Sequence, residues 1–121
     1  MCNLYSITKG QQAIRELYRA ATDRSGNLRS MSGLFPDYPA PIVRNGPDGR
    51  ELVKARWRMP SPVFALHGKR TDPGVTNIRT VKSPHWRRWL GIENRCLVPF
   101  TSSGQQRPFR LGQGVVLLAL V

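Results

Sequence analysis

The chain has 121 residues, 40% of them hydrophobic, which is enough for one domain with a buried core. Nineteen Lys and Arg against seven Asp and Glu give a formal net charge of +12, which favours a polyanionic partner such as nucleic acid. No segment approaches the roughly 20 consecutive apolar residues that span a bilayer, and no signal peptide is visible, so we expect no membrane association and a cytoplasmic, nucleoid-associated location.

The N-terminus carries the most informative residue, Cys2, directly behind Met1. Because Cys is small, we expect Met1 to be removed, which leaves a free α-amine and a thiol on adjacent carbons. These groups titrate at roughly pH 8 and 8.5, so each is partly deprotonated near neutrality. The amine condenses with an aldehyde to an imine, and the thiol then closes a thiazolidine ring. The simpler alternative is that Cys2 is a small residue at a frayed terminus.

Residues 1–7 are expected to form a short strand, and residues 8–23 the first helix. Residues 8–11 resemble a capping box, and the Ser-Gly-Asn sequence at residues 25–27 ends the helical pattern. The apolar residues that fall on one helical face are Ile14, Leu17, Tyr18 and Ala21.

Six of the ten prolines fall within residues 36–62, where they punctuate two strand-like runs. Residues 41–44 and 52–57 flank a turn-rich segment at residues 45–49, which predicts a β-hairpin with a slightly long loop. Residues 59–62 end the second strand because proline cannot donate to a strand ladder.

Residues 83–91 predict a second short helix. Ser83 can cap its N-terminus, Pro84 suits the first helical position, and Gly91 suits the position beyond the end. Trp86 shares one face with Trp89 and Leu90, which favours a core role for these tryptophans.

The remaining apolar runs, residues 95–100 and 115–121, predict buried strands. No internal repeat or domain linker is visible, so residues 1–121 are expected to form a single domain. The whole pattern predicts an α+β fold, rich in short strands, with two short helices.

Cysteine and histidine are scarce, with Cys2, Cys96, His67 and His85 the only examples. Their spacing fits neither a disulfide framework nor a metal site, so we expect no metal and no cofactor. Cys96 lies in an apolar run, which favours a place in the core.

Residues 54–88 hold nine basic residues and a single acid, Asp72. Basic groups that follow a phosphate backbone, together with aromatics that stack on exposed bases, are typical of single-stranded nucleic-acid binding. The alternative is that the tryptophans belong to the core, in which case the nucleic-acid signal rests on the arginines. The interleaved aromatic and imidazole side chains are Trp57, Phe64, His67, His85 and Trp86.

Five short segments follow one another along the chain in a fixed order. They are Met1-Cys2, Ala40-Pro41-Ile42-Val43-Arg44, Ala55-Arg56-Trp57-Arg58-Met59-Pro60, Thr76-Asn77-Ile78-Arg79 and Arg95-Cys96-Leu97-Val98-Pro99. In that order they resemble the SRAP family, the SOS response-associated peptidases or abasic-site-processing proteins, over residues 1–103. The resemblance implies an SRAP-like mixed β-sheet or barrel.

The resemblance also implies a function in the DNA damage (SOS) response. Members of this family capture the ring-opened aldehyde of an abasic site in single-stranded DNA, as a covalent thiazolidine crosslink to the mature N-terminal cysteine. They also carry a peptidase (hydrolase) label, which is tied to self-removal of the initiator methionine. On this basis the expected partner is single-stranded DNA with abasic sites, bound by a monomer with lyase-type and crosslinking activity.

Carried onto this chain, the resemblance makes Cys2 the nucleophile and Asn77 the residue that positions the terminal amine and the sugar. It makes Arg79 a DNA-binding residue beside Asn77. The other residues that it places along the DNA groove are Pro41, Trp57, Arg44 and Arg58.

The chain also departs from the family pattern. Gln105 stands where a glutamate would act as acid and base in sugar ring opening, and an amide cannot exchange a proton near neutral pH. No histidine follows His85, and residues 3–5 lack the arginine that many members have there. Residues 104–121 do not resemble the family, so we expect the C-terminal half of its fold to be missing and the crosslinking activity to be weakened.

Three alternatives remain open. The chain is a catalytically inactive, basic, single-stranded nucleic-acid-binding protein; or an N-terminal-nucleophile amidohydrolase in which Cys2 attacks an amide; or a chain whose unpaired strand edges prevent stable folding.

Overall fold

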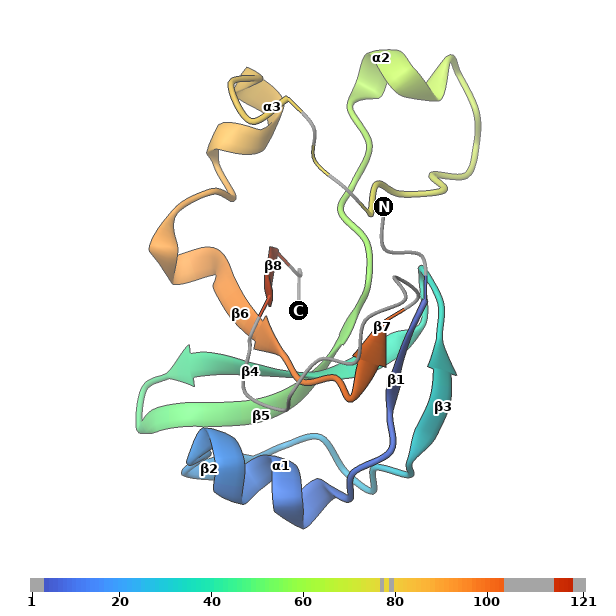
Figure 1. The fold of residues 1–121 in the computed structure, drawn as a ribbon. Helices are drawn as coiled ribbons and strands as arrows, with labels where there is room; N and C mark the ends of the chain where they lie inside the picture. Colours follow the sequence, from blue (N-terminus) through green and yellow to red (C-terminus); the bar gives the residue numbers. More distant parts are fainter. Residues whose placement is uncertain (1–3, 77, 79, 104–114, 119–121) are drawn as a thin grey trace.

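The computed structural model of the chain describes residues 4–76, 78, 80–103 and 115–118. These residues form one sheet of three strands and one of five, with short helices at their margins. The predicted α+β, strand-rich fold class is thereby confirmed. Among the described strands, neither sheet closes into a barrel (Figure 1).

The smaller sheet has β1 (Tyr5–Ile7) at its centre, antiparallel to β3 (Met31–Leu34) and to β7 (Ser102–Ser103). The backbone N–H of Thr101 donates to the carbonyl of Ser6 over 2.7 Å, just before β7 begins. The first strand is therefore confirmed over its described part, and it is tied to a segment about 95 residues later in the chain.

The larger sheet is built on a hairpin of β4 (Pro39–Gly46) and β5 (Gly49–Arg56), which crosses the middle of Figure 1. The hairpin confirms the prediction, but its loop is shorter than expected because pairing continues to Gly46 opposite Gly49. Gly49 has a φ of +116°, a conformation that a residue with a side chain rarely adopts.

Three short strands complete the larger sheet. β2 (Thr22–Asp23) runs parallel to β5, β6 (Arg95–Val98) runs antiparallel to β4, and β8 (Val115–Leu118) runs antiparallel to β6. The order β2-β5-β4-β6-β8 makes this a mixed sheet with β6 in its interior. The two predicted C-terminal strands are thus confirmed where the structure describes them.

Helix α1 (Gln11–Tyr18) is shorter than predicted and lies below the hairpin in Figure 1. The expected capping box is wrong: Gly10 occupies the N-cap and provides no side-chain hydrogen bond. The Thr8 hydroxyl instead donates to the Thr101 hydroxyl over 3.2 Å, so a tertiary contact replaces the local cap. The helix ends early because Arg19 adopts the left-handed conformation, with a φ of 51°.

The predicted second helix is also shorter. It forms α3 (Pro84–Arg87), and after Gly91 the chain makes a separate 3₁₀ turn, η1 (Ile92–Asn94). A four-residue helix, α2 (Val63–Leu66), was not predicted. It buries none of its side chains, so it carries no amphipathic pattern that sequence reasoning could detect.

The hydrophobic core joins side chains from α1 and from both sheets. Leu52 of β5 is 0% exposed and Leu34 of β3 is 1% exposed. Cys96 is buried in this core, as expected from its apolar run. Trp57 belongs to it as well, directly after β5.

Candidate nucleic-acid interface

Trp57 connects the N-terminal strand to the end of the hairpin. Its ring meets the Tyr5 ring edge-to-face, with centroids 5.1 Å apart. Its indole N–H is buried without a hydrogen-bond partner among the described residues. The strand that follows Cys2 in the sequence therefore packs against the hairpin segment that resembles the family motif.

Two residues farther along, Met59 pairs with Val75 in an isolated antiparallel bridge. Each residue donates its backbone N–H to the carbonyl of the other, and both distances are 2.8 Å. This bridge fixes the chain immediately before Thr76, where the fourth family-like segment begins.

Asp72 closes the base of the loop between these two residues. Its carboxylate accepts the backbone N–H groups of Ser61 and Gly74, each over 2.8 Å. The bonds from Ser61 and then from Gly74 hold the pKa of Asp72 below its ordinary value. Arg58 Nη1 donates to the Asp72 backbone carbonyl over 2.8 Å. Hydrogen bonds to both the side chain and the backbone of Asp72 therefore hold the loop in place.

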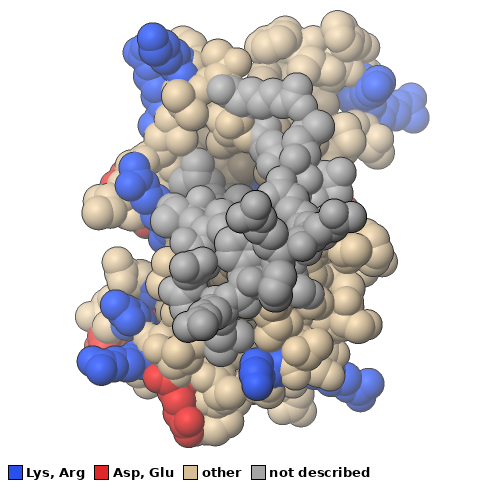
Figure 2. All heavy atoms as spheres, viewed as in Figure 1, with Lys and Arg blue, Asp and Glu red and all other residues tan. Residues whose placement is uncertain are grey.

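Positively charged side chains outnumber negatively charged ones in this chain. Figure 2 shows Lys and Arg at separate points around the rim of one face, with few acidic groups between them. A polyanion that followed this rim would meet cations at several points.

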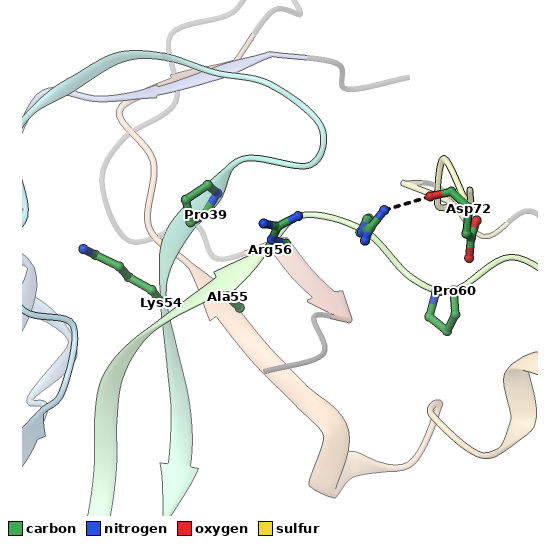
Figure 3. A pocket seen from close by; sticks show the side chains of 7 residues that line it. Pro39, Lys54, Ala55, Arg56, Pro60 and Asp72 are labelled. Carbon is green, nitrogen blue, oxygen red and sulfur yellow. Dashed lines mark hydrogen bonds between the residues drawn. The ribbon is translucent and has the colours of Figure 1, made fainter. Parts of the chain in front are cut away.

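A cleft of about 450 Å³ opens at one end of the hairpin. Arg56 projects from the end of β5 and Asp72 lies on the loop across from it, while the Lys54 side chain extends from β5 away from both (Figure 3). The residues that line it are Pro39, Lys54, Ala55, Arg56, Arg58, Pro60 and Asp72.

The Asp37 carboxylate neutralises part of the positive charge of this cleft. Arg58 Nε lies 3.0 Å from Asp37 Oδ1, and Arg56 Nη1 lies 3.4 Å from the same oxygen. Lys54 makes no ion pair within the described part of the chain and is exposed. The cleft thus holds two guanidinium groups that share one carboxylate, with the Lys54 ammonium group at its margin.

The predicted stacking side chains divide into buried and exposed groups. Trp86 is buried, while Trp89 is half-buried with the Arg88 guanidinium 4.3 Å from its ring centroid. His85 packs on both tryptophans, and its Nε2 lies 3.0 Å from the Pro60 carbonyl. The core prediction is therefore confirmed for Trp86 and holds in part for Trp89.

On α2 and directly after it, the side chains face solvent. Phe64 is 78% exposed, and His67 is exposed in the left-handed conformation with a φ of 46°. Of Trp57, Phe64 and Trp86, Phe64 is thus the one whose ring is available to stack on a base without unfolding.

The sequence-predicted site residues fall into two groups. Pro41 and Trp57 are buried and Arg58 lines the cleft, whereas Arg44 lies at the other end of the hairpin with its Nε 2.6 Å from Glu51 Oε1. Because they are buried, Pro41 and Trp57 could affect the shape of a DNA groove only by supporting the residues that line it. Four predicted residues lie outside the described part of the chain, and they are Cys2, Asn77, Arg79 and Gln105.

Sequence reasoning missed Lys54 and Arg56 as members of a common site. The signal was present, because residues two apart in a strand share one face of the sheet. Lys54 and Arg56 alternate with buried Val53, Ala55 and Trp57, which is the pattern of a strand with one basic and one apolar face.

Within the described ranges, no group of three or more His, Cys, Asp or Glu side chains could hold a metal ion. No helix in the same part of the chain is long and apolar enough to cross a membrane.

Comparison with known proteins finds a similarity of fold and no similarity that assigns a function. No protein-family model matches the chain, and no curated protein matches it. A crystal structure of a Bordetella bronchiseptica protein, determined by a structural genomics consortium, is similar with a TM-score of 0.52 and 18% sequence identity. The match covers 84% of this chain and 49% of that protein, so the chain spans about half of the other protein's length.

Proposed function

We propose that this chain is an SRAP-type abasic-site-processing protein. It binds single-stranded DNA and traps the aldehyde of an abasic site through Cys2 once Met1 is removed. The proposal rests on the resemblance of five ordered segments. One structural observation supports it: the second, third and fifth segments contact one another, and residues that follow the first segment and precede the fourth contact the third.

Those contacts form a continuous chain. β1, which follows Cys2, packs on Trp57 through Tyr5, and Met59 bridges to Val75 next to the segment that contains Asn77. β4 pairs with β5 and β6, and the chain after β6 returns to β1 through Thr101. Segments that are far apart in the sequence are thus neighbours, as a composite site requires.

The proposed chemistry needs an amine and a thiol on one residue. The Cys2 amine adds to the aldehyde carbon, and loss of water leaves a C=N bond. The Cys2 sulfur then adds to the imine carbon, the thiol proton passes to nitrogen, and a thiazolidine ring results. Atoms and electrons balance without an oxidant, a reductant or a metal.

The basic cleft supplies the affinity in this proposal. Lys54, Arg56 and Arg58 would contact phosphates and hold the strand while the aldehyde reaches Cys2, which raises its effective concentration. The exposed Phe64 ring offers a stacking surface for a base, a contact worth about 1–3 kcal/mol.

The test uses Met1-free protein and single-stranded DNA with one abasic site. We expect a heat-stable, covalent species on a denaturing gel. Cys2→Ala should abolish it. Cys2→Ser keeps the amine but lacks the thiol, so it should crosslink only when borohydride reduces the imine. Equal product from wild type and Cys2→Ala would refute the proposal.

A second candidate function is a basic nucleic-acid-binding protein without chemistry. Gln105 favours it, because an amide in place of the acid–base carboxylate removes a contribution of about 10²–10⁴-fold. This candidate predicts affinity that is indifferent to Cys2 and to the abasic site. Intact-mass measurement separates the two early, since a retained Met1 blocks the amine. Gln105→Glu should accelerate crosslinking only if the first function is correct.

A further inference from the structure

A second cleft, of about 320 Å³, lies at the opposite end of the hairpin from the first. Asn45 of β4 pairs directly with Arg50 of β5. On the other side of β4, Val43 pairs with Leu97 of β6, and the same antiparallel register continued by two residues brings Asn45 opposite Arg95. Directly paired residues share one face of a sheet. Arg95, Asn45 and Arg50 therefore form a row across three adjacent strands, and all three line the cleft.

The two guanidinium groups in this row are each anchored at one end. Arg50 Nη1 donates to the carbonyl of Tyr18, the last residue of α1, over 3.0 Å. Arg95 Nη2 donates to the Leu90 carbonyl over 3.2 Å. In the part of the chain that the structure describes, one bond each leaves most of their five N–H donors uncommitted. A guanidinium fixed in this way loses less freedom when it binds a ligand.

The charge balance of the cleft is positive. Within the described residues, neither Arg50 nor Arg95 makes an ion pair and no carboxylate lines the cleft. Glu51, which follows Arg50 in β5, pairs with Arg44 at 2.6 Å and lies 3.9 Å from Arg24. Asp48 in the hairpin turn and Glu93 on η1 are exposed and lie outside the lining.

We propose that the row Arg95–Asn45–Arg50 is a phosphate-binding site. Neighbouring strands lie about 4.8 Å apart, so the outer arginines are about 10 Å apart at the backbone and can approach one phosphate from both sides. Each guanidinium presents a fork that matches phosphate oxygens, and the Asn45 amide donates between them. The ligand is a phosphate group, either in a nucleic-acid backbone or free in solution.

The site is independent of the chemistry proposed at Cys2. It lies about 20 Å along β4 from the first cleft, because Pro39 and Asn45 are six residues apart at about 3.4 Å per residue. Binding to it requires neither an aldehyde nor removal of Met1. Undamaged DNA therefore tests it alone.

The decisive variant is Asn45→Asp, which puts a carboxylate between the two arginines. The side chain is exposed and nearly unchanged in size, so the fold should persist and its thermal midpoint should not fall. The matched control is Asn27→Asp, an exposed residue of the same type that changes the net charge equally. Fluorescence anisotropy with labelled, 5′-hydroxyl (dT)₂₀ measures affinity, and calorimetry with inorganic phosphate at constant ionic strength measures the free ion.

We expect Asn45→Asp to weaken (dT)₂₀ binding by at least about tenfold relative to Asn27→Asp, since a like charge then faces the phosphate. Arg50→Lys with Arg95→Lys, which keeps the charge but removes the forks, should also weaken it. If only the inorganic phosphate signal depends on Asn45, the site still binds phosphate and the free ion is the ligand. If Asn45→Asp and Asn27→Asp bind both probes equally, the proposal is wrong.

Discussion

Some residues adopt backbone conformations that their own residue type does not favour. Arg19 ends α1 in the left-handed region at a φ of 51°, and its backbone N–H reaches the carbonyls of Arg15 and Glu16. A residue with a Cβ is strained there by about 1–2 kcal/mol, whereas glycine adopts the conformation freely. The protein tolerates this strain because the next residues must turn toward β5.

Arg19→Gly should therefore stabilise the protein. Relief of strain exceeds the extra chain entropy of glycine, and we expect a gain of about 0.5–1 kcal/mol in the free energy of unfolding. Urea denaturation measures it. Arg29→Gly is the control, since Arg29 is exposed with an ordinary φ and glycine there should bring no gain. Equal effects at both positions would contradict the role of the left-handed cap.

Asp72 predicts a pH dependence in the loop beside the first cleft. The hydrogen bonds from Ser61 and Gly74 hold the pKa of Asp72 below its ordinary value of 3.8, so the folded loop favours the ionised form. Its contribution to stability is complete above that value and is lost as the pH falls through the lowered pKa. As the pH falls below 3.8 and Asp72 takes up a proton, the NMR amide resonances of Ser61 and Gly74 should shift together. In Asp72→Asn this joint shift should be missing, while the other acid transitions of the protein remain.

A core substitution measures how strongly the hairpin depends on its buried face. Leu52→Ala should lower the free energy of unfolding by about 2–5 kcal/mol, because Leu52 is completely buried and its removal leaves a cavity. Leu17→Ala on α1 is the control, since Leu17 is 43% exposed and alanine favours a helix. We expect the control to cost under about 1 kcal/mol. Similar losses for the two variants would contradict this view of the core.

At the scale of elements, the outermost strand of the larger sheet contributes through its backbone. β8 pairs with β6 at four positions, from Arg95 opposite Leu118 to Val98 opposite Val115. Without β8, that side of β6 would become an exposed edge with unpaired N–H and C=O groups, next to an apolar core.

Deletion of residues 115–121 should therefore lower the thermal midpoint and produce concentration-dependent association, detectable by light scattering. Deletion of residues 119–121 alone is the matched control, because it leaves all four β6–β8 pairs in place. If the two deletions behave alike, the edge is not protected by β8.

Sequence reasoning succeeded where the signal was local and failed where distant contacts competed. The hairpin followed from its turn residues and strand-like flanks, and the core place of Cys96 followed from its apolar run. The cap at Thr8 was wrong because Thr101, 93 residues away, binds that hydroxyl.

The candidate site shows the same division. The common face of Lys54 and Arg56 could be read from a period of two, once the strand is known. The row formed by Arg95, Asn45 and Arg50 needs the register of three strands, which no single segment contains. The roles of Cys2 and Asn77 came from resemblance alone and stay predictions.

For the whole molecule, the charge distribution sets how binding responds to salt. Each phosphate contact on single-stranded nucleic acid contributes about 0.7 to the slope of log affinity against log salt concentration. Lys54→Gln and Arg56→Gln should each reduce the magnitude of the slope by about this amount. Lys9→Gln removes an equal charge from an exposed position outside the cleft and should leave the slope unchanged. Equal slopes in all three variants would exclude the first cleft as a contact.

The pairing of β8 with β6 has a consequence for how the chain tolerates change. Backbone hydrogen bonds in a ladder do not distinguish one side chain from another, so the edge of β6 accepts any extended segment that can reach it. Residues 115–118 therefore need an extended conformation more than they need particular side chains. A different extended segment placed after β6 could still complete the sheet, so this edge of β6 tolerates wide changes of sequence in its partner strand.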